Sequence, residues 1–186
     1  MGLKLFGKNI IQSYKHHIMS IDHAIIDDTT GNDESRYVLR PIDSDRMEEE
    51  LKPIGTTVTV KNLRKLLHRN QSLVEGFVFV DGDGCSLGTI WVMYRGGNDL
   101  EYRIRETDAY IFDVYINETH RGAGLAGRMI RSLMDHLYDK GIERACLAVS
   151  LKNTSAIRAY EKVGFKTVCD KWFIRAFKLN IPYHKL

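Results

Sequence analysis

Hydrophobic positions along the chain change period from one stretch to the next, and each period predicts a kind of element. Apolar residues spaced three and four apart predict helices over residues 43–51, 59–69, 122–139 and 154–163. Apolar and aromatic runs predict strands over residues 37–41, 76–81, 87–94, 101–106, 109–116, 145–150, 165–169 and 172–178. The turn DGDG at residues 81–84 predicts that 76–81 and 87–94 form a hairpin.

The N-terminal stretch has a pattern of its own. Its apolar residues fall at near-helical spacing, at Leu3, Phe6, Ile10, Tyr14 and Ile18. Three lysines and no acid in residues 1–20 make this expected helix basic. We expect it to pack on its own domain or on a second subunit, as in a homodimer, while a membrane surface or another partner is the alternative. A polar, turn-rich segment then separates an N-terminal extension, residues 1–36, from one domain over residues 37–186.

One unit of the pattern predicts parallel strands. The strand at 109–116 is followed by a helix whose stripe repeats every four residues, and then by the strand at 145–150. A strand–helix–strand unit of this kind pairs its strands in parallel. We therefore predict an α/β (α+β) fold with a mixed, mostly antiparallel sheet, a central parallel pair and flanking helices. Its ligand site is expected past the carboxyl ends of Ile116 and Ser150.

Composition narrows the classes of function. The hydrophobic share of 44% and the charged share of 27% are ordinary for a soluble globular protein. A net charge of +3, carried by the first 20 residues, argues against nucleic-acid binding. No apolar run is long enough to span a membrane and no signal peptide is evident, so we expect a cytoplasmic protein. Three distant cysteines and scattered histidines predict no metal site.

The turn that opens the helix at 122–139 is rich in glycine and predicts a phosphate site. Its residues are Arg121, Gly122, Ala123, Gly124, Leu125, Ala126 and Gly127. Glycines let a backbone approach a ligand closely, and the free N–H groups of a helix start attract an anion. Arg121 adds a cation beside them. The alternative, a turn with no ligand, explains the order of strand, glycines and helix less well.

The same residues also match the pattern GxGxxG of dinucleotide sites, but weakly. Several polar residues separate Gly122 from the preceding strand. The strand at 145–150 ends in Ser150 rather than in the acidic residue that binds a ribose. One parallel pair is also fewer than a dinucleotide fold requires.

Two motifs resemble those of the GNAT superfamily of N-acetyltransferases. Arg121, Gly124 and Ala126 match its cofactor motif, Arg/Gln-x-x-Gly-x-Gly/Ala. About 30 residues later comes its second signature, represented by Asn153, Ala156, Tyr160, Gly164 and Phe165. The resemblance covers residues 37–178 and is strongest over 109–165. It implies that acetyl-CoA is the cofactor and that the two parallel strands splay apart to admit its pantetheine arm.

The resemblance also implies roles for particular residues. The backbone of Val114, Tyr115 and Ile116 would pair with the pantetheine amides. The turn at 121–127 would hold the pyrophosphate, and Asn153 and Ala156 would line the other side. A strand N–H near Ile116 would stabilise the oxyanion.

Two catalytic candidates follow from this arrangement. A phenol such as that of Tyr160 can donate a proton to the departing thiolate, although a tyrosine at this position can also simply belong to the core. Asp113 is an acid within an apolar strand, an unusual position unless the carboxylate is paired or used, and we favour it as the base. The other carboxylates and the histidine considered as bases are Glu101, Glu106, Glu118 and His120.

The acceptor is expected to be a primary amine of a small molecule, an amino sugar or a peptide terminus. Residues 51–58 and the last two strands would shape its pocket, where Lys171, Trp172 and Arg175 favour an anionic or aromatic acceptor if they are not simply core and surface. A non-catalytic coenzyme A-binding module, acting as a sensor or partner subunit, is the alternative function.

Overall fold

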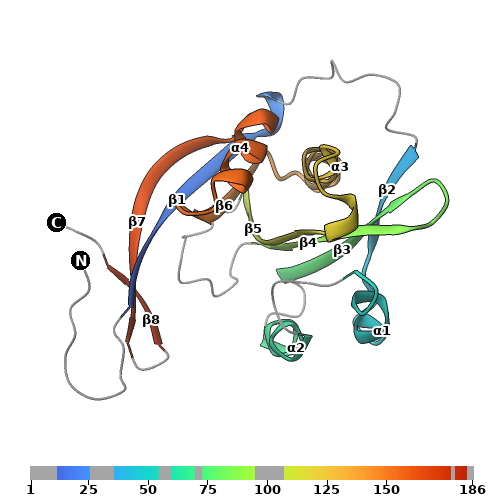
Figure 1. Ribbon diagram of the computed structural model, residues 1–186, viewed down its shortest axis with the longest axis horizontal. Coiled ribbons are helices and arrows are strands. Elements are labelled where there is room, and N and C mark those ends of the chain that lie inside the picture. The colour runs from blue at the N-terminus through green and yellow to red at the C-terminus, as the bar shows by residue number, and fades with distance from the viewer. Residues whose placement is uncertain are drawn as a thin grey trace.

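A computed structural model describes residues 12–25, 36–54, 60–69, 73–94, 107–176 and 179–183. Eight strands within these ranges form one sheet in the order β2-β3-β4-β5-β6-β1-β7-β8 (Figure 1). The strands are β1 (Gln12–Asp22), β2 (Tyr37–Pro41), β3 (Val74–Asp81), β4 (Ser86–Met93), β5 (Asp108–Ile116), β6 (Arg144–Ser150), β7 (Lys166–Ala176) and β8 (Leu179–Tyr183). The helices are α1 (Met47–Leu51), α2 (Val60–Arg69), α3 (Leu125–Asp139) and α4 (Thr154–Val163), with 3-10 turns η1 (His23–Ile25) and η4 (Glu118–His120).

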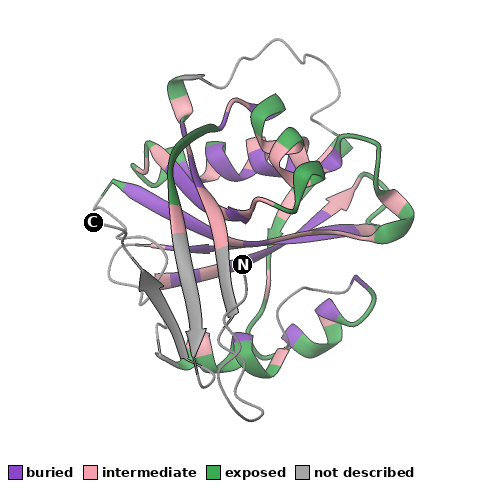
Figure 2. Cartoon of the chain, turned by 60° about the vertical axis from the view of Figure 1, so that its left-hand side comes forward, coloured by how far each residue is buried: buried purple, intermediate pink, exposed green. Residues whose placement is uncertain are grey.

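Helices cover both faces of the sheet, and each face has its own core (Figure 1). Under α3 and α4, the stripe that includes Met129 and Leu133 packs on strand residues such as Ile111; we call this side the α3–α4 face. Under α1 and α2, Met47 and Leu63 pack around Trp91; we call this side the α1–α2 face. Buried residues run along the middle of the sheet, whereas the helices are buried over only part of their surface, as their amphipathic patterns predict (Figure 2).

The sheet is antiparallel except for one central pair, β5 and β6, as predicted. Their ladder starts at Asp108↔Arg144 and ends at Ile111↔Leu147. Beyond that point β5 continues to pair with β4 as far as Ile116, on its other side. Residues 112–116 of β5 and 148–150 of β6 therefore diverge, and we call this region the β5–β6 fork.

A β-bulge lies where the fork opens. Trp91 of β4 is opposite Asp113, but the next residue, Val92, is opposite Ile111, so Phe112 is the extra residue. Residues directly opposite each other in a ladder share a face. Because Trp91 belongs to the core of the α1–α2 face, Asp113 also lies on that face.

The N-terminal stretch differs from its prediction. A helix through Tyr14 and Ile18 is wrong, because Gln12–Asp22 is strand β1, paired with β6 on one side and β7 on the other. Ile18 and Met19 are both fully buried although they point to opposite faces, and burial of both faces removes the alternation that identifies a strand. Leu3, Phe6 and Ile10 lie outside the described residues.

The other boundaries move by a few residues. The helix predicted over 43–51 begins only at Met47, after a turn in which the Asp43 carboxylate accepts the Asp45 N–H. The helix predicted from Gly122 begins at Leu125. The two strands predicted near the C-terminus are one continuous strand, β7, followed by β8. The strand predicted over 101–106 lies outside the described residues.

Candidate active site

The glycine turn adopts a conformation that glycine favours. Gly122 and Gly124 have φ of 87° and 72°, in the left-handed region, and Gly124 is the N-cap of α3. A Cβ built on either glycine would have no heavy atom within 4 Å, so the turn is open on that side. The first N–H groups of a 15-residue helix are therefore presented beside open space, the arrangement that binds phosphate groups.

Further along α3, the third glycine of the motif has a different role. A Cβ on Gly127 would lie 3.2 Å from a methyl group of Val163 in α4. The glycine therefore permits α3 and α4 to approach each other closely. The position that matches the third glycine of GxGxxG thus serves helix packing here.

Arg121 is held at the mouth of the fork by three neighbours. Its Nε donates to the carbonyl of Ile116 at 3.1 Å, and its Nη1 lies 3.3 Å from a carboxylate oxygen of Glu118. The guanidinium carbon also lies 5.4 Å from the ring centroid of Tyr115. These contacts fix a cation between the end of β5 and the start of α3, while half of the side chain remains exposed.

The backbone of Val114, Tyr115 and Ile116 belongs to the fork. These residues keep their ladder with β4, and the ladder with β6 has already ended at Ile111. Backbone N–H and C=O groups need a partner wherever water is excluded. The fork-side groups of this segment are therefore suited to pairing with a ligand that carries amides.

Tyr160 and Asp113 approach the fork from opposite faces. Tyr160 lies on α4, is partly buried and has its ring 5.7 Å from that of Phe165. Asp113 lies on the α1–α2 face and is only 4% exposed. Burial and the nearby charge of Asp113 raise the pKa of Tyr160 to about 12. The phenol is thus protonated at neutral pH, and the Asp113 carboxylate is close enough for its negative charge to disfavour ionisation of the phenol.

Asn153 caps the helix that carries Tyr160. Its Oδ1 accepts the N–H of Ala156 at 3.2 Å and the hydroxyl of Ser155 at 3.1 Å, which satisfies a free donor of the first turn. Ala156 packs against the main core. The structure therefore brings Asn153, Ala156 and Tyr160 together along α4, beside the fork.

The alternative bases are less well positioned among the described residues. Glu118 is largely exposed and paired with Arg121. His120 ends the 3-10 turn η4, beyond the carboxyl end of β5. Glu101 and Glu106 lie outside the described residues, as do residues 55–58 of the expected acceptor loop. Trp172 and Arg175 belong to β7, but their side chains are not among those described.

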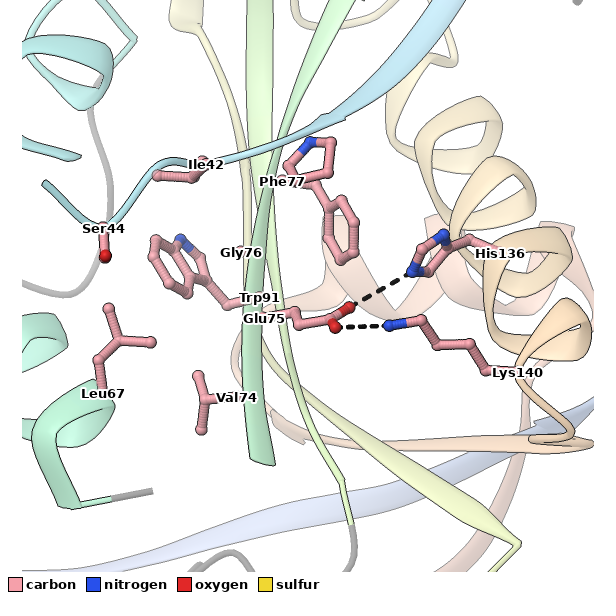
Figure 3. A pocket seen from close by; sticks show the side chains of 11 residues that line it. Ile42, Ser44, Leu67, Val74, Glu75, Gly76, Phe77, Trp91, His136 and Lys140 are labelled. Atoms are coloured by element: carbon pink, nitrogen blue, oxygen red, sulfur yellow. Dashed lines mark hydrogen bonds and ion pairs between the residues drawn. The ribbon is translucent and has the colours of Figure 1, made fainter. Parts of the chain in front are cut away.

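A cavity of about 320 Å³ lies at the start of β3, between α2 and the C-terminal end of α3 (Figure 3). Its polar part is Glu75, which accepts from Lys140, His136 and Tyr94. Burial alone would raise the pKa of Glu75, but these hydrogen bonds lower it overall. His136 and Lys140 are at the C-terminal end of α3, whereas the glycine turn is at its N-terminal start. The cavity is therefore separate from the fork.

Two other kinds of feature are absent from the described residues. They hold no helix long and apolar enough to cross a membrane. Within the same part of the chain, no three His, Cys, Asp or Glu side chains gather as metal ligands do.

A glycine-rich helix start that follows two diverging parallel strands is the arrangement expected from the resemblance of the sequence motifs to N-acetyltransferases. A comparison with family models identifies the class: residues 37–165 match the acetyltransferase (GNAT) family. The match covers more than half of the chain, and the protein belongs to this family. The family consists of acetyltransferases that in general bind acetyl-CoA.

Curated relatives share parts of this region. Mycothiol acetyltransferase of Cellulomonas flavigena is 30% identical over 98 residues, which are 51% of this chain and 28% of the relative. The enzyme of the same name from Corynebacterium efficiens is 39% identical over 61 residues, 33% of this chain and 20% of the relative. Human N-acetyltransferase 8B is 29% identical over 70 residues, 38% of this chain and 31% of the relative. The match thus spans less than a third of each of these proteins.

Solved structures agree on the fold. An acetyltransferase assigned to the GNAT family from Novosphingobium aromaticivorans has a TM-score of 0.57 at 19% identity, and the alignment covers 92% of this chain and 68% of that one. Spermidine N-acetyltransferase from Vibrio cholerae has a TM-score of 0.51 at 17% identity, with 70% and 79% covered. At these identities the likeness extends to the fold alone.

Proposed function

We propose that this protein transfers an acetyl group from acetyl-CoA to a primary amine by direct attack of the amine on the thioester. The observation that carries the proposal is the β5–β6 fork, which opens beyond Ile111↔Leu147 and whose β5 arm is followed by the glycine turn and the N-terminus of α3. One end of that region suits a diphosphate and the other suits an amide-containing arm. Membership of the GNAT family supports the same reading.

The described residues fit coenzyme A. Gly122 and Gly124 leave the N-terminus of α3 open, since no atom lies where their Cβ atoms would be. Arg121 contributes a fixed cation, and residues 121–127 would hold the pyrophosphate. Val114, Tyr115 and Ile116 would offer backbone partners to the pantetheine amides, with Asn153 and Ala156 on the opposite wall. When bound, acetyl-CoA supplies an acyl group activated as a thioester.

The two catalytic candidates lie on different faces of the sheet at the fork, and each has its own role in the proposed reaction. Asp113 accepts a proton from the attacking ammonium, because a free alkylamine is otherwise protonated near neutral pH. The amine nitrogen then forms a bond to the acetyl carbon, and the carbon–sulfur bond breaks. Tyr160 donates its proton to the departing sulfur, and the second proton that the acceptor nitrogen loses as the amide forms restores the phenol. Its raised pKa keeps that proton available at neutral pH.

A binding experiment followed by a turnover experiment tests the proposal. Acetyl-CoA is expected to raise the thermal midpoint of the protein in a concentration-dependent way, while NAD and ATP leave it unchanged. Thiol release in the presence of amines then measures turnover. A midpoint that responds to NAD but not to acetyl-CoA contradicts the cofactor assignment. Stabilisation by acetyl-CoA without thiol release for any amine favours the alternative, a non-catalytic coenzyme A-binding module.

A further inference from the structure

Strand β1 lies next to the fork, although it comes from the N-terminal part of the chain and precedes the region matched by the family model. It pairs with the diverging end of β6 through Ile18↔Ala148, His17↔Val149 and His16↔Ser150. The family match begins only at residue 37. The N-terminal segment therefore lies beside the fork, on the side of β6 that faces away from β5.

The alternation of side chains assigns each residue of β1 to a face. Met19 and its opposite residue Leu147 belong to the core under α3 and α4. His17, two residues earlier, shares that face, and its Nδ1 lies 2.6 Å from a carboxylate oxygen of Asp170. His16 points the other way, to the α1–α2 face. Its opposite residue in β7 is Lys171, which therefore lies on the same face.

On the α1–α2 face, an acidic side chain lies on one side of the fork and basic side chains lie on the other. Asp113 stands on β5, on one side. His16 and Lys171 stand side by side on β1 and β7, on the other side, and both are partly exposed. Ser150, at the end of β6, lies between the two groups. An acceptor lying across this face would meet a carboxylate at one end and two basic side chains at the other.

We propose that His16 and Lys171 bind an anionic group of the acceptor, while the acceptor amine lies at Asp113. The substrate class is then a primary amine that carries a carboxylate or phosphate. Paired strands are about 4.8 Å apart, and β5 and β6 have already separated at Asp113, so the two charges of the acceptor would lie at least roughly 10 Å apart. The inference rests on the proposed acetyl transfer, and it disfavours polyamines, which have no anionic group.

Matched pairs of amines test the substrate class. Each pair has an anionic and a neutral member of similar length: triglycine and triglycinamide, 6-aminohexanoate and 6-aminohexanamide, glucosamine 6-phosphate and glucosamine. Because a hydrogen bond to a charged group contributes about 1.5–3 kcal/mol, we expect kcat/KM of at least one anionic member to exceed that of its neutral partner by about tenfold or more. The carboxylate and phosphate pairs distinguish the two sources of the anion.

Variants then test the two residues. His16→Gln and Lys171→Gln are each expected to raise KM for the preferred anionic amine about tenfold, with little change in kcat and no change for its neutral partner. His17→Gln is the matched control, since His17 is the adjacent histidine and points to the other face. A loss caused by misfolding would affect the neutral amine and the thermal midpoint as well.

The outcomes separate the two proposals. Equal rates for anionic and neutral amines, a preference for spermidine, or no acetylated anionic amine overturns the inference about His16 and Lys171. In the first two cases the acetyl transfer itself stands. Failure of acetyl-CoA to stabilise the protein, with no turnover of any amine, removes the proposed function instead.

Discussion

The surroundings of Tyr160 in α4 favour the protonated form of its side chain. Its ring packs beside Phe165, and its pKa is raised to about 12 by burial and by Asp113. The folded protein therefore disfavours the phenolate, and the phenol keeps its proton from acidic pH until well above pH 10. If it donates that proton to the leaving sulfur, its own ionisation has no effect on the rate between pH 6 and 9.

Tyr160→Phe is expected to retain binding of acetyl-CoA and to lower kcat by about a hundredfold or more, the usual contribution of a general acid. Because the tyrosine does not titrate between pH 6 and 9, the variant is expected to keep the shape of the wild-type pH–rate profile at a lower level. Stopped-time assays across that range, with the thermal shift by acetyl-CoA as the control for binding, measure both. An unchanged kcat would assign Tyr160 to the core alone.

Much of the site at this scale follows from the sequence motifs. Arg121, Gly124 and Tyr160 are identified by their spacing as candidates, and the structure places Arg121 after the end of β5, Gly124 at the N-cap of α3 and Tyr160 within α4. The face of Asp113 does not follow from spacing, because the bulge at Phe112 changes the alternation of β5. The proposed role of His16 does not follow from the sequence, because its ladder partner Ser150 is 134 positions away in the chain and the local spacing predicts a helix where the structure has strand β1.

At the scale of elements, α3 has a left-handed glycine at each end. Gly124 precedes its first turn with φ of 72°, and Gly141 follows its last with φ of 77°. A Cβ at either position would meet no atom within 4 Å, so an added methyl group causes backbone strain without a clash. The two ends differ in the groups they present: N–H groups at the mouth of the fork at one end, and C=O groups at the surface at the other.

This pair of glycines gives a matched prediction. Gly124→Ala and Gly141→Ala are each expected to lower the free energy of unfolding by about 1–2 kcal/mol, the cost of a left-handed conformation for a residue with a Cβ. Only Gly124→Ala is expected to weaken acetyl-CoA binding, because it disturbs the N–H groups of the first turn. Urea unfolding and a binding titration measure the two effects. Equal affinities in the two variants would contradict a phosphate site at the start of α3.

The elements predicted best are those with one buried face. Helices α2 and α4 match their predicted ranges to within a residue because an amphipathic stripe and a stop signal such as Gly164 mark them. The sequence pattern predicts two strands where the structure has the single strand β7, and a helix where it has β1. In β1 the period of the apolar residues is ambiguous, since the buried pair Ile18 and Met19 faces both cores. Only long-range pairing with β6 and β7 decides its structure, and no local pattern contains that information.

At the scale of the whole molecule, β1 joins the two halves of the sheet. β6 and β7 are each paired with it, and within the described part of the chain β6 does not pair directly with β7. The C-terminal strands β7 and β8 are therefore attached to the β5–β6 pair through the N-terminal segment. At the C-terminal end of β1, Arg144 of β6 adds contacts between strands. Its Nε lies 3.1 Å from Asp22 and 3.6 Å from the buried Asp108. The strand that brings His16 to the fork is thus also the strand on which the continuity of the sheet depends.

Ile18→Ala is the test of that continuity. Ile18 is fully buried between Ala148 of β6 and Cys169 of β7, so removing three carbon atoms leaves a cavity in the middle of the sheet. The expected loss is about 2–5 kcal/mol in the free energy of unfolding, measured by urea titration. Val168→Ala, in the adjacent strand but 60% exposed, is the control and is expected to change the value by about 0.5 kcal/mol or less. If both variants unfold at the same urea concentration, β1 is not a central strand in solution. In that case His16 would have no fixed position beside the fork.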